Sequence, residues 1–376
     1  MKRAAAALLL LVPLTFAPAR SNIYDPWVCP REPTRSFPAG FELPVDRQTQ
    51  VCTGAAVRWE DPHVGGWGGG DCPAGHVART PVVFVHGQST DGWYFNSSDA
   101  SDGSDVNVRD KFLGAGYCPR ELWAITYSGD ATPPGSVGSS YNTFADIQAE
   151  EVYEFMLAVR DFVGTAQIDV IGHSLGVTVV RKAMYLHRDE PAERNPYTFV
   201  RRGLMIAGAN HGTTTCRGEE MVAAVEVCRE AHPGSPWLAE LNAIGESPGP
   251  TRWITVCECT GTSDAFYLGP DALSPLLQGA DAIVLPGTNH FELAAGEPAI
   301  AAYLPRLVEG SAAAAAVRPR VQRPATNGNA RPRPGAPGSS SRGSLPATGV
   351  ARAGSLGVLL LWLSLAVRAG WMVRVR

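Results

Sequence analysis

The clearest indication of the fold is the segment Ile171-Gly172-His173-Ser174-Leu175-Gly176. It follows a short apolar run, residues 168–171, and precedes a helix-like stretch, residues 177–186. A G-x-S-x-G pattern between strand and helix is typical of a sharp turn that exposes a serine hydroxyl. The glycines are needed where strand and helix cross too closely for a Cβ. The pattern predicts that Ser174 is a nucleophile; the alternative is a tight turn with an idle serine.

Further apolar runs on both sides of this turn are predicted to be buried strands. They cover residues 82–85, 122–127, 168–171, 204–207, 253–256 and 282–285. Helical patterns are predicted at residues 106–113, from Asn142 or Thr143 to residue 163, at 272–277 and at 295–307. Strands that alternate with helices indicate an α/β fold with a mainly parallel sheet and helices on both faces.

A serine nucleophile needs a histidine base and an acid that orients the base. In proteins that use this turn, the three residues follow in the order serine, acid, histidine. His290 lies past the last predicted strand and is the predicted base, and Asp264 follows the strand at 253–256 and is the predicted acid. His211, after the strand at 204–207, is the alternative base, and Asp271 is the second choice of acid.

The oxyanion of the reaction needs two backbone donors. Leu175 follows the nucleophile, and Gln88 lies in the loop His86-Gly87-Gln88 after the strand at 82–85. We therefore expect the N–H groups of Gln88 and Leu175 to form the oxyanion hole, and His86 to have a structural role.

Neither a metal site nor a cofactor is predicted. The acidic loop near residue 100 is interpreted as a solvated surface loop rather than a calcium site, because its spacing is not that of an EF-hand. Its oxygen-bearing residues are Asp99, Asp102, Asp105 and Asn107. Cys257 and Cys259 lack a second Cys or His pair nearby, so their spacing does not predict a metal site.

Several stretches together resemble the class 2 lipases of the α/β-hydrolase superfamily. They are Pro81-Val82-Val83-Phe84-Val85-His86-Gly87, Gly172-His173-Ser174-Leu175-Gly176-Val177-Thr178, Gly208-Ala209-Asn210-His211-Gly212 and the loop of His290. The resemblance covers about residues 80–308, and extracellular polyhydroxyalkanoate depolymerases with a lipase-like serine box are similar too. It implies an α/β-hydrolase fold, a catalytic triad, an ester or lipid substrate and no cofactor.

The first 80 residues are expected to fall into two parts. Residues 1–19 read as a secretory signal peptide with a positive start, an apolar core and cleavage after Ala19. Residues 20–80 are interpreted as a disulfide-tied extension that contains a flexible loop at residues 65–70. An even count of 8 cysteines in an exported chain favours disulfides over metal ligands.

The other end of the chain predicts attachment to a cell surface. Residues 311–344 are rich in Ala, Arg, Pro, Gly and Ser and are predicted to be an extended linker. Leu345-Pro346-Ala347-Thr348-Gly349 resembles the sorting signal of sortase substrates, and residues 345–376 continue with an apolar run and a basic tail. Cleavage after Thr348 by a sortase-like enzyme is expected; a plain membrane anchor and a freely secreted protein are the alternatives.

Residues 81–310 are thus predicted to form the catalytic domain. The whole chain is 45% apolar, which allows a sizeable core, and its net charge of −4, with no basic cluster in this domain, argues against nucleic-acid binding. The expected function is a secreted serine hydrolase of carboxylic esters. A polyester depolymerase, a peptidase, and an inactive surface-binding protein are the alternatives.

Overall fold

The computed structural model describes residues 34–42, 64–88, 90–98, 106–127, 146–216 and 226–310. The predicted signal peptide, the linker and the sorting signal lie outside the described residues, as do Cys29 and Cys52. Within the described ranges, none of the helices is long and apolar enough to cross a membrane.

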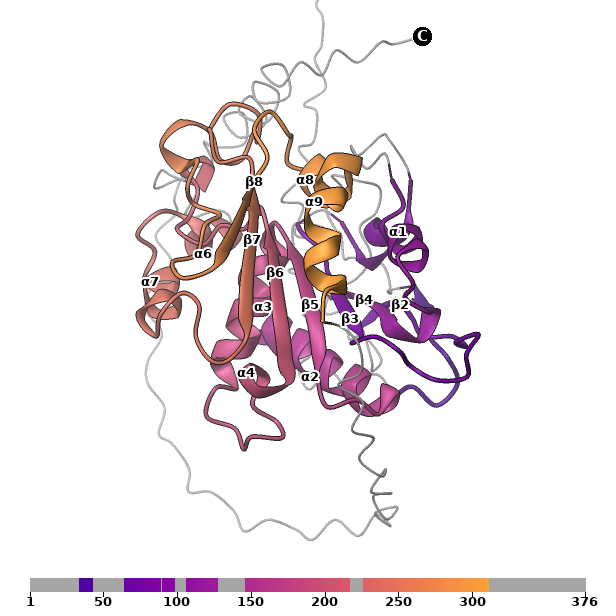
Figure 1. Cartoon of the computed structure of the whole chain (residues 1–376). Helices are drawn as coiled ribbons and strands as arrows, with labels where there is room; N and C mark the ends of the chain where they lie inside the picture. Colours follow the sequence, from indigo (N-terminus) through magenta and orange to yellow (C-terminus); the bar gives the residue numbers. More distant parts are fainter. Residues whose placement is uncertain are drawn as a thin grey trace, which may run out of the picture.

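A single sheet of eight strands forms the centre of the described chain (Figure 1). Its spatial order is β1-β2-β4-β3-β5-β6-β7-β8; β2 pairs antiparallel with β4, and every pairing from β4 to β8 is parallel. The strands are β1 (Arg35–Ser36), β2 (Gly65–Gly68), β3 (Val82–Val85), β4 (Leu122–Thr126), β5 (Ile168–His173), β6 (Val200–Ile206), β7 (Arg252–Cys257) and β8 (Asp281–Val284).

Helices cover both faces of this sheet (Figure 1). The helices α2 and α3 pack against each other on one face, and α1, α8 and α9 lie on the other. The helices are α1 (Val108–Gly114), α2 (Asp146–Val163), α3 (Leu175–Leu186), α4 (Pro196–Phe199), α6 (Glu226–Ala231), α7 (Pro236–Ala243), α8 (Glu292–Ala295) and α9 (Glu297–Val308). The α/β-hydrolase fold expected from the sequence is confirmed.

The apolar patterns of the sequence explain where the core lies. Strands β3 and β4 are buried along their whole lengths, as expected of parallel strands covered on both faces. Helix α2 buries a face whose residues recur at intervals of three and four: Val152, Phe155, Met156 and Val159, all 0% exposed. These contacts hold the loops that follow the carboxyl ends of the strands on a rigid base.

The prediction of a flexible loop at residues 65–70 is wrong, because β2 occupies its first four residues. Gly66 has φ of +120°, and a Cβ there would lie 2.0 Å from the carbonyl oxygen of Ala124 in β4. Trp67 donates from Nε1 to the carbonyl oxygen of Gly92 at 2.7 Å. Glycine is therefore required here for close strand pairing rather than for flexibility.

The helix predicted at residues 272–277 is also wrong. The chain forms a 3₁₀ turn, η7 (Gly269–Asp271), and continues through further turns. Pro275 lacks the N–H that a helix interior needs, and its ring would clash with the preceding turn. Leu273 in this stretch is 59% exposed, so the apolar residues do not form one buried face.

Three disulfides are present in the described chain, which confirms the predicted use of the cysteines. They join Cys72 to Cys118, Cys216 to Cys228 and Cys257 to Cys259, and none of the described cysteines is free. The first of them links the region before residue 80 to the start of β4. Strands β1 and β2, which come before residue 80, extend the central sheet. The predicted domain boundary at residue 80 remains a prediction.

Candidate active site

Ser174 lies at the turn between β5 and α3, as predicted. Its backbone has φ 55° and ψ −123°, a left-handed conformation that is unusual for a residue with a side chain. A Cβ on Gly172 would lie 3.0 Å from Val177 Cα, and a Cβ on Gly176 would lie 2.4 Å from the carbonyl oxygen of His86. Gly172 is thus needed for the crossing of strand and helix, and Gly176 for the approach of α3 to the end of β3.

This turn lies where the order of the strands reverses. The chain builds β4 on one side of β3 and then β5 on the other, so the carboxyl ends of β3 and β5 flank a topological switch point. In open α/β sheets, ligands bind outside the carboxyl ends of the strands at such a point. Gly87, after β3, would bring a Cβ within 2.8 Å of Ser174 Cβ, so the two loops are in close contact.

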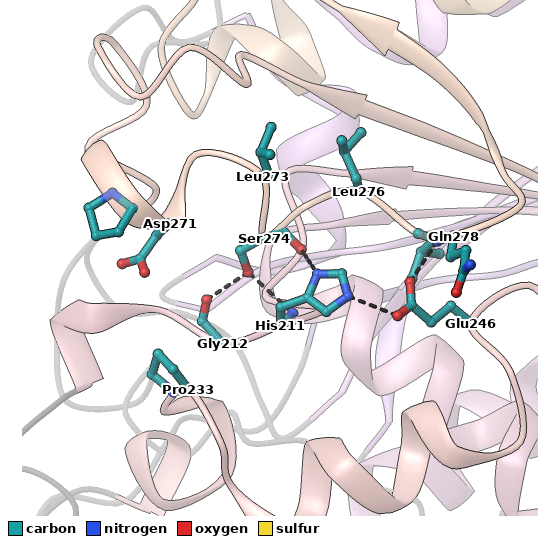
Figure 2. A pocket seen from close by; sticks show the side chains of 11 residues that line it. His211, Gly212, Pro233, Glu246, Asp271, Leu273, Ser274, Leu276 and Gln278 are labelled. Carbon is teal, nitrogen blue, oxygen red and sulfur yellow. Dashed lines mark hydrogen bonds and ion pairs between the residues drawn. The ribbon is translucent and has the colours of Figure 1, made fainter.

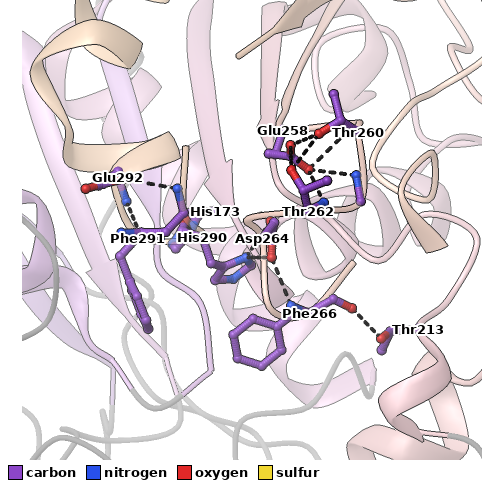
Figure 3. Close-up of polar contacts among 12 residues, drawn as sticks. His173, Thr213, Glu258, Thr260, Thr262, Asp264, Phe266, His290, Phe291 and Glu292 are labelled. Carbon is purple, nitrogen blue, oxygen red and sulfur yellow. Dashed lines mark hydrogen bonds and ion pairs between the residues drawn. The ribbon is translucent and has the colours of Figure 1, made fainter. Parts of the chain in front are cut away.

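His290 and Asp264, the predicted base and acid, are brought together in the structure (Figure 3). Nδ1 of His290 lies 3.0 Å from each carboxylate oxygen of Asp264. Both side chains are buried, with 4% and 2% of their surface exposed. Asp264 also accepts the backbone N–H of Phe266 at 3.0 Å, which fixes the carboxylate. The pair therefore leaves Nε2 of His290 as the nitrogen that can exchange a proton.

His290 lies beside the residue that precedes Ser174. His173 donates from Nε2 to the carbonyl oxygen of His290 at 3.1 Å, and the two ring centroids are 4.9 Å apart. Burial holds the pKa of His173 well below its usual value, so its ring is neutral. The ring of Phe266 also packs against His290, with 4.4 Å between the two ring centroids. These contacts set the orientation of the histidine ring.

The peptide between Gly87 and Gln88 is held by its carbonyl oxygen. That oxygen accepts hydrogen bonds from His86 Nδ1 at 2.8 Å and from the hydroxyl of Thr90 at 3.0 Å. The N–H of a trans peptide points away from its carbonyl, so these two donors also fix the direction of the Gln88 N–H. The N–H of Leu175 lies at the first residue of α3, where the helix dipole favours negative charge.

His86 has the structural role that the sequence predicts. It is fully buried, and its Nε2 accepts the backbone N–H of Tyr127 at 3.3 Å while Nδ1 donates to Gly87. Burial lowers the pKa of His86 to about 4, although the two backbone hydrogen bonds act in the opposite direction. The imidazole is therefore neutral near neutral pH, and both of its nitrogens are occupied.

His211 and Asp271, the alternative base and acid, lie elsewhere. His211 lines a cavity of about 570 Å³ (Figure 2), where Nε2 contacts Glu246 at 2.9 Å and Nδ1 contacts the carbonyl of Ser274 at 3.2 Å. Because both ring nitrogens of His211 are occupied, neither is left for a serine. Asp271 accepts the backbone N–H of Thr214 at 2.5 Å rather than bonding a histidine. The geometry favours His290 and Asp264.

Among the described residues, no group of three or more His, Cys, Asp or Glu side chains is arranged to hold a metal ion. Of the acidic loop considered from sequence, Asp99, Asp102 and Asp105 lie outside the described residues. Asn107 is described, and its side chain caps α1 by accepting the N–H of Asp110 at 3.0 Å.

Two neighbours of His290, namely His173 and Phe266, are not evident from the sequence. The contact of His173 joins positions 117 residues apart, which no local pattern reveals. Phe266 follows Asp264 by two residues, and only the folded loop shows that its ring faces the histidine.

Comparison with known proteins supports the resemblance to lipases. Residues 79–259 match the family described as Lipase (class 2), which is the family that the sequence resembles, and no curated protein sequence matches the chain. Among solved structures, the mature lipase BlEst2 of Bacillus licheniformis is 14% identical with a TM-score of 0.42, over 65% of this chain and 96% of that chain. Phospholipase PlaB of Legionella pneumophila is 16% identical with a TM-score of 0.41, over 58% and 55%. Aspergillus fumigatus lipase B is 14% identical with a TM-score of 0.41, over 67% and 59%. The family match supports an ester hydrolase.

Proposed function

We propose that this chain, whose residues 79–259 match the class 2 lipases, is a secreted serine hydrolase that cleaves carboxylic esters. The observation that carries the proposal is the buried contact of His290 Nδ1 with Asp264 at 3.0 Å, next to the turn that holds Ser174. A histidine oriented by a carboxylate beside a strained serine turn has the chemistry of a nucleophilic acyl transfer.

In the proposed reaction, Ser174 Oγ attacks the carbonyl carbon of the ester while His290 Nε2 takes the hydroxyl proton. Asp264 stabilises the imidazolium that forms, and the N–H groups of Gln88 and Leu175 bind the negative oxygen of the tetrahedral intermediate. The alcohol leaves with the proton from His290. Water, activated by the same histidine, then attacks the acyl-enzyme and releases the acid.

Hydrolysis assays test this proposal and identify the type of ester. Purified protein is assayed on p-nitrophenyl esters of increasing acyl length, on a triglyceride emulsion, on a polyhydroxyalkanoate film and on peptide substrates, with Ser174→Ala as the control. We expect hydrolysis of the soluble esters that is lost in the variant. Activity on the film alone would identify a polyester depolymerase, and activity on peptides alone a peptidase. Absence of hydrolysis from all substrates would indicate a surface-binding protein and overturn the proposal.

We also propose that the chain is exported and attached to the cell surface. Three disulfides among the described residues support an oxidising environment. Removal of residues 1–19 and cleavage after Thr348, in Leu345-Pro346-Ala347-Thr348-Gly349, are the expected processing steps. Mass spectrometry of the mature protein from a cell-wall fraction checks both ends. A mature chain that retains Trp371 would contradict sorting and favour a plain membrane anchor.

A further inference from the structure

The carboxylate of Glu258 is buried at the end of β7 and accepts a set of hydrogen bonds (Figure 3). The residue is 1% exposed. Its Oε2 accepts the backbone N–H groups of Thr260, Gly261 and Thr262 at 3.1, 2.8 and 3.2 Å. Its Oε1 accepts the hydroxyl groups of Thr260 and Thr262. A buried carboxylate with this many donors is fixed in position.

The donors come from both loops that carry the proposed acid and base. Residues 260–262 lead directly to Asp264, and Glu258 Oε1 also faces the backbone N–H of Gly287 at 3.4 Å, three residues before His290. Gly287 has φ of +79°, in the left-handed region that favours glycine. Glu258 therefore contacts the acid loop and the histidine loop at the same time.

The disulfide between Cys257 and Cys259 encloses Glu258. Cys257 is the last residue of β7 and is 0% exposed, and Cys259 has φ of +58°, which turns the chain away from the strand direction. The turn brings residues 260–262 back over the side chain of Glu258. Because the disulfide joins the residues on either side of Glu258, it restricts the backbone conformation of Glu258.

The carboxyl group of Glu258 is ionised at neutral pH. Burial by itself would raise the pKa of its carboxyl group, but hydrogen bonds from Thr260, Thr262 and Gly287 lower it to about 2. At neutral pH the Glu258 carboxylate is thus a charged acceptor for hydrogen bonds from both loops.

We infer that Glu258, enclosed by the Cys257–Cys259 disulfide, is a positioning residue that joins the loops of Asp264 and His290 and sets the geometry of that pair. The inference rests on the proposed function, in which this pair moves the proton of Ser174. Glu258 and the disulfide are assigned no contact with the reacting atoms. Their effect on catalysis is transmitted through the two loops.

Glu258→Gln tests the inference, and Glu121→Gln is its matched control. Glu121 is 0% exposed and also accepts three backbone N–H groups, those of Ala78, Arg79 and Cys118 at 2.6, 2.6 and 2.8 Å. It precedes β4 and therefore lies at the opposite edge of the parallel strands. Both substitutions place an amide NH₂ among donors, so both should lower the melting temperature.

Only Glu258→Gln should change catalysis. Active sites are counted with a fluorophosphonate, and kcat per labelled site should fall about 10- to 100-fold with KM nearly unchanged, since a displaced acid–base pair impairs the chemical step. Glu121→Gln should keep the wild-type kcat per site. An unchanged kcat in a folded Glu258→Gln variant, or an equal loss in both variants, would overturn the inference.

A proton NMR measurement decides the question without relying on turnover. The Nδ1–H of His290 should give a low-field signal in the wild type, assigned by its loss in Asp264→Asn. We expect the signal to be broadened or shifted in Glu258→Gln and retained in Glu121→Gln. A wild type that shows the signal but hydrolyses no ester would refute the proposed function alone. An unaltered signal in Glu258→Gln would refute the positioning role alone.

The disulfide is tested by a second pair of variants that keeps Glu258. Cys257→Ala/Cys259→Ala should lower kcat per labelled site and alter the His290 signal. Cys72→Ala/Cys118→Ala removes a disulfide with a separation of 46 residues, and it should lower stability but leave kcat per site unchanged. If the first pair kept the wild-type kcat and signal, the disulfide would have no part in positioning. The same comparison replaces Glu258→Gln if that variant does not fold.

Discussion

His290 Nδ1 lies 3.0 Å from both carboxylate oxygens of Asp264, and the side chains of the two residues are 4% and 2% exposed. A buried histidine that meets a carboxylate through Nδ1 is fixed in one tautomer, with Nε2 free to accept a proton. This relationship distinguishes His290 from His211, both of whose ring nitrogens are already occupied.

Asp264→Asn should therefore lower kcat on the order of 10⁴-fold while the protein stays folded, because the amide no longer selects the correct tautomer. His290→Ala should be at least as damaging. Steady-state kinetics on a soluble p-nitrophenyl ester measure both. Asp271→Asn is the control, and a severe loss there with a neutral Asp264→Asn would move the acid to Asp271.

Gly87→Ala tests the close approach of the loop after β3 to Ser174. The new Cβ would lie 2.8 Å from Ser174 Cβ and 3.2 Å from the carbonyl oxygen of His173, so the loop and the Gln88 N–H must shift. We expect kcat to fall about 10- to 100-fold with a small change in the melting temperature.

Gly114→Ala is the control for this substitution, because a Cβ at Gly114 meets nothing within 4 Å. Its kcat should equal that of the wild type. A Gly87→Ala enzyme with wild-type kcat would mean that the loop after β3 does not contribute to the site.

Stability should decrease as the pH falls from 6.5 towards 4, because His86 is buried as the neutral form. The pKa of His86 is lowered from 6.5 to about 4, so between these values the unfolded chain binds a proton that the folded protein does not. The free energy of unfolding should fall by about 3 kcal/mol over this range from His86, and His173 contributes in the same direction. Above pH 6.5 both histidines are neutral in the folded and the unfolded chain, so neither makes the free energy of unfolding depend on pH.

Urea unfolding at pH 7.0 and 4.5 measures this dependence in the wild type and in His86→Gln. The variant should be less stable at pH 7.0 and should lose less stability on acidification. Equal losses in the two proteins would show that His86 is not the group responsible.

Thiol counting tests the arrangement of the cysteines. Six of the eight cysteines are paired among the described residues, and Cys29 and Cys52 lie outside them. Alkylation after denaturation without reductant should therefore modify at most Cys29 and Cys52. Modification of all eight cysteines would contradict both the disulfides and the proposed export.

Strands that are continuous apolar runs could be predicted from the sequence, because parallel strands covered on both faces are rich in apolar residues. The order of the elements also restricts which loops meet at one edge of the sheet, and it led to the choice of Ser174, Asp264 and His290, whose catalytic roles remain predictions. The pattern failed where tertiary contact decides the local structure. Residues 65–68 contain three glycines and one tryptophan and become a strand only because β4 lies beside them.

Glu258 illustrates the same limit at the candidate site. It contacts Gly287 across 29 positions in the sequence, and the two loops that it joins follow different strands. The segment Cys257-Glu258-Cys259 matches no sequence motif that would predict such a role. The role of the His173 ring could not be predicted either, because its hydrogen-bond partner is the backbone carbonyl of His290 rather than a side chain.

The role of Ser174 as the nucleophile is tested most directly by the site of covalent labelling by a fluorophosphonate. Only a serine activated by a base reacts with this probe at neutral pH, so the measurement examines the nucleophile without assuming a substrate. Wild-type protein is labelled, digested and analysed by mass spectrometry, with Ser174→Ala and His290→Ala treated in parallel. We expect one phosphonylated residue, Ser174, in the wild type and no stable labelling in either variant. Labelling of another serine, or an unlabelled wild type that is folded, would contradict this role.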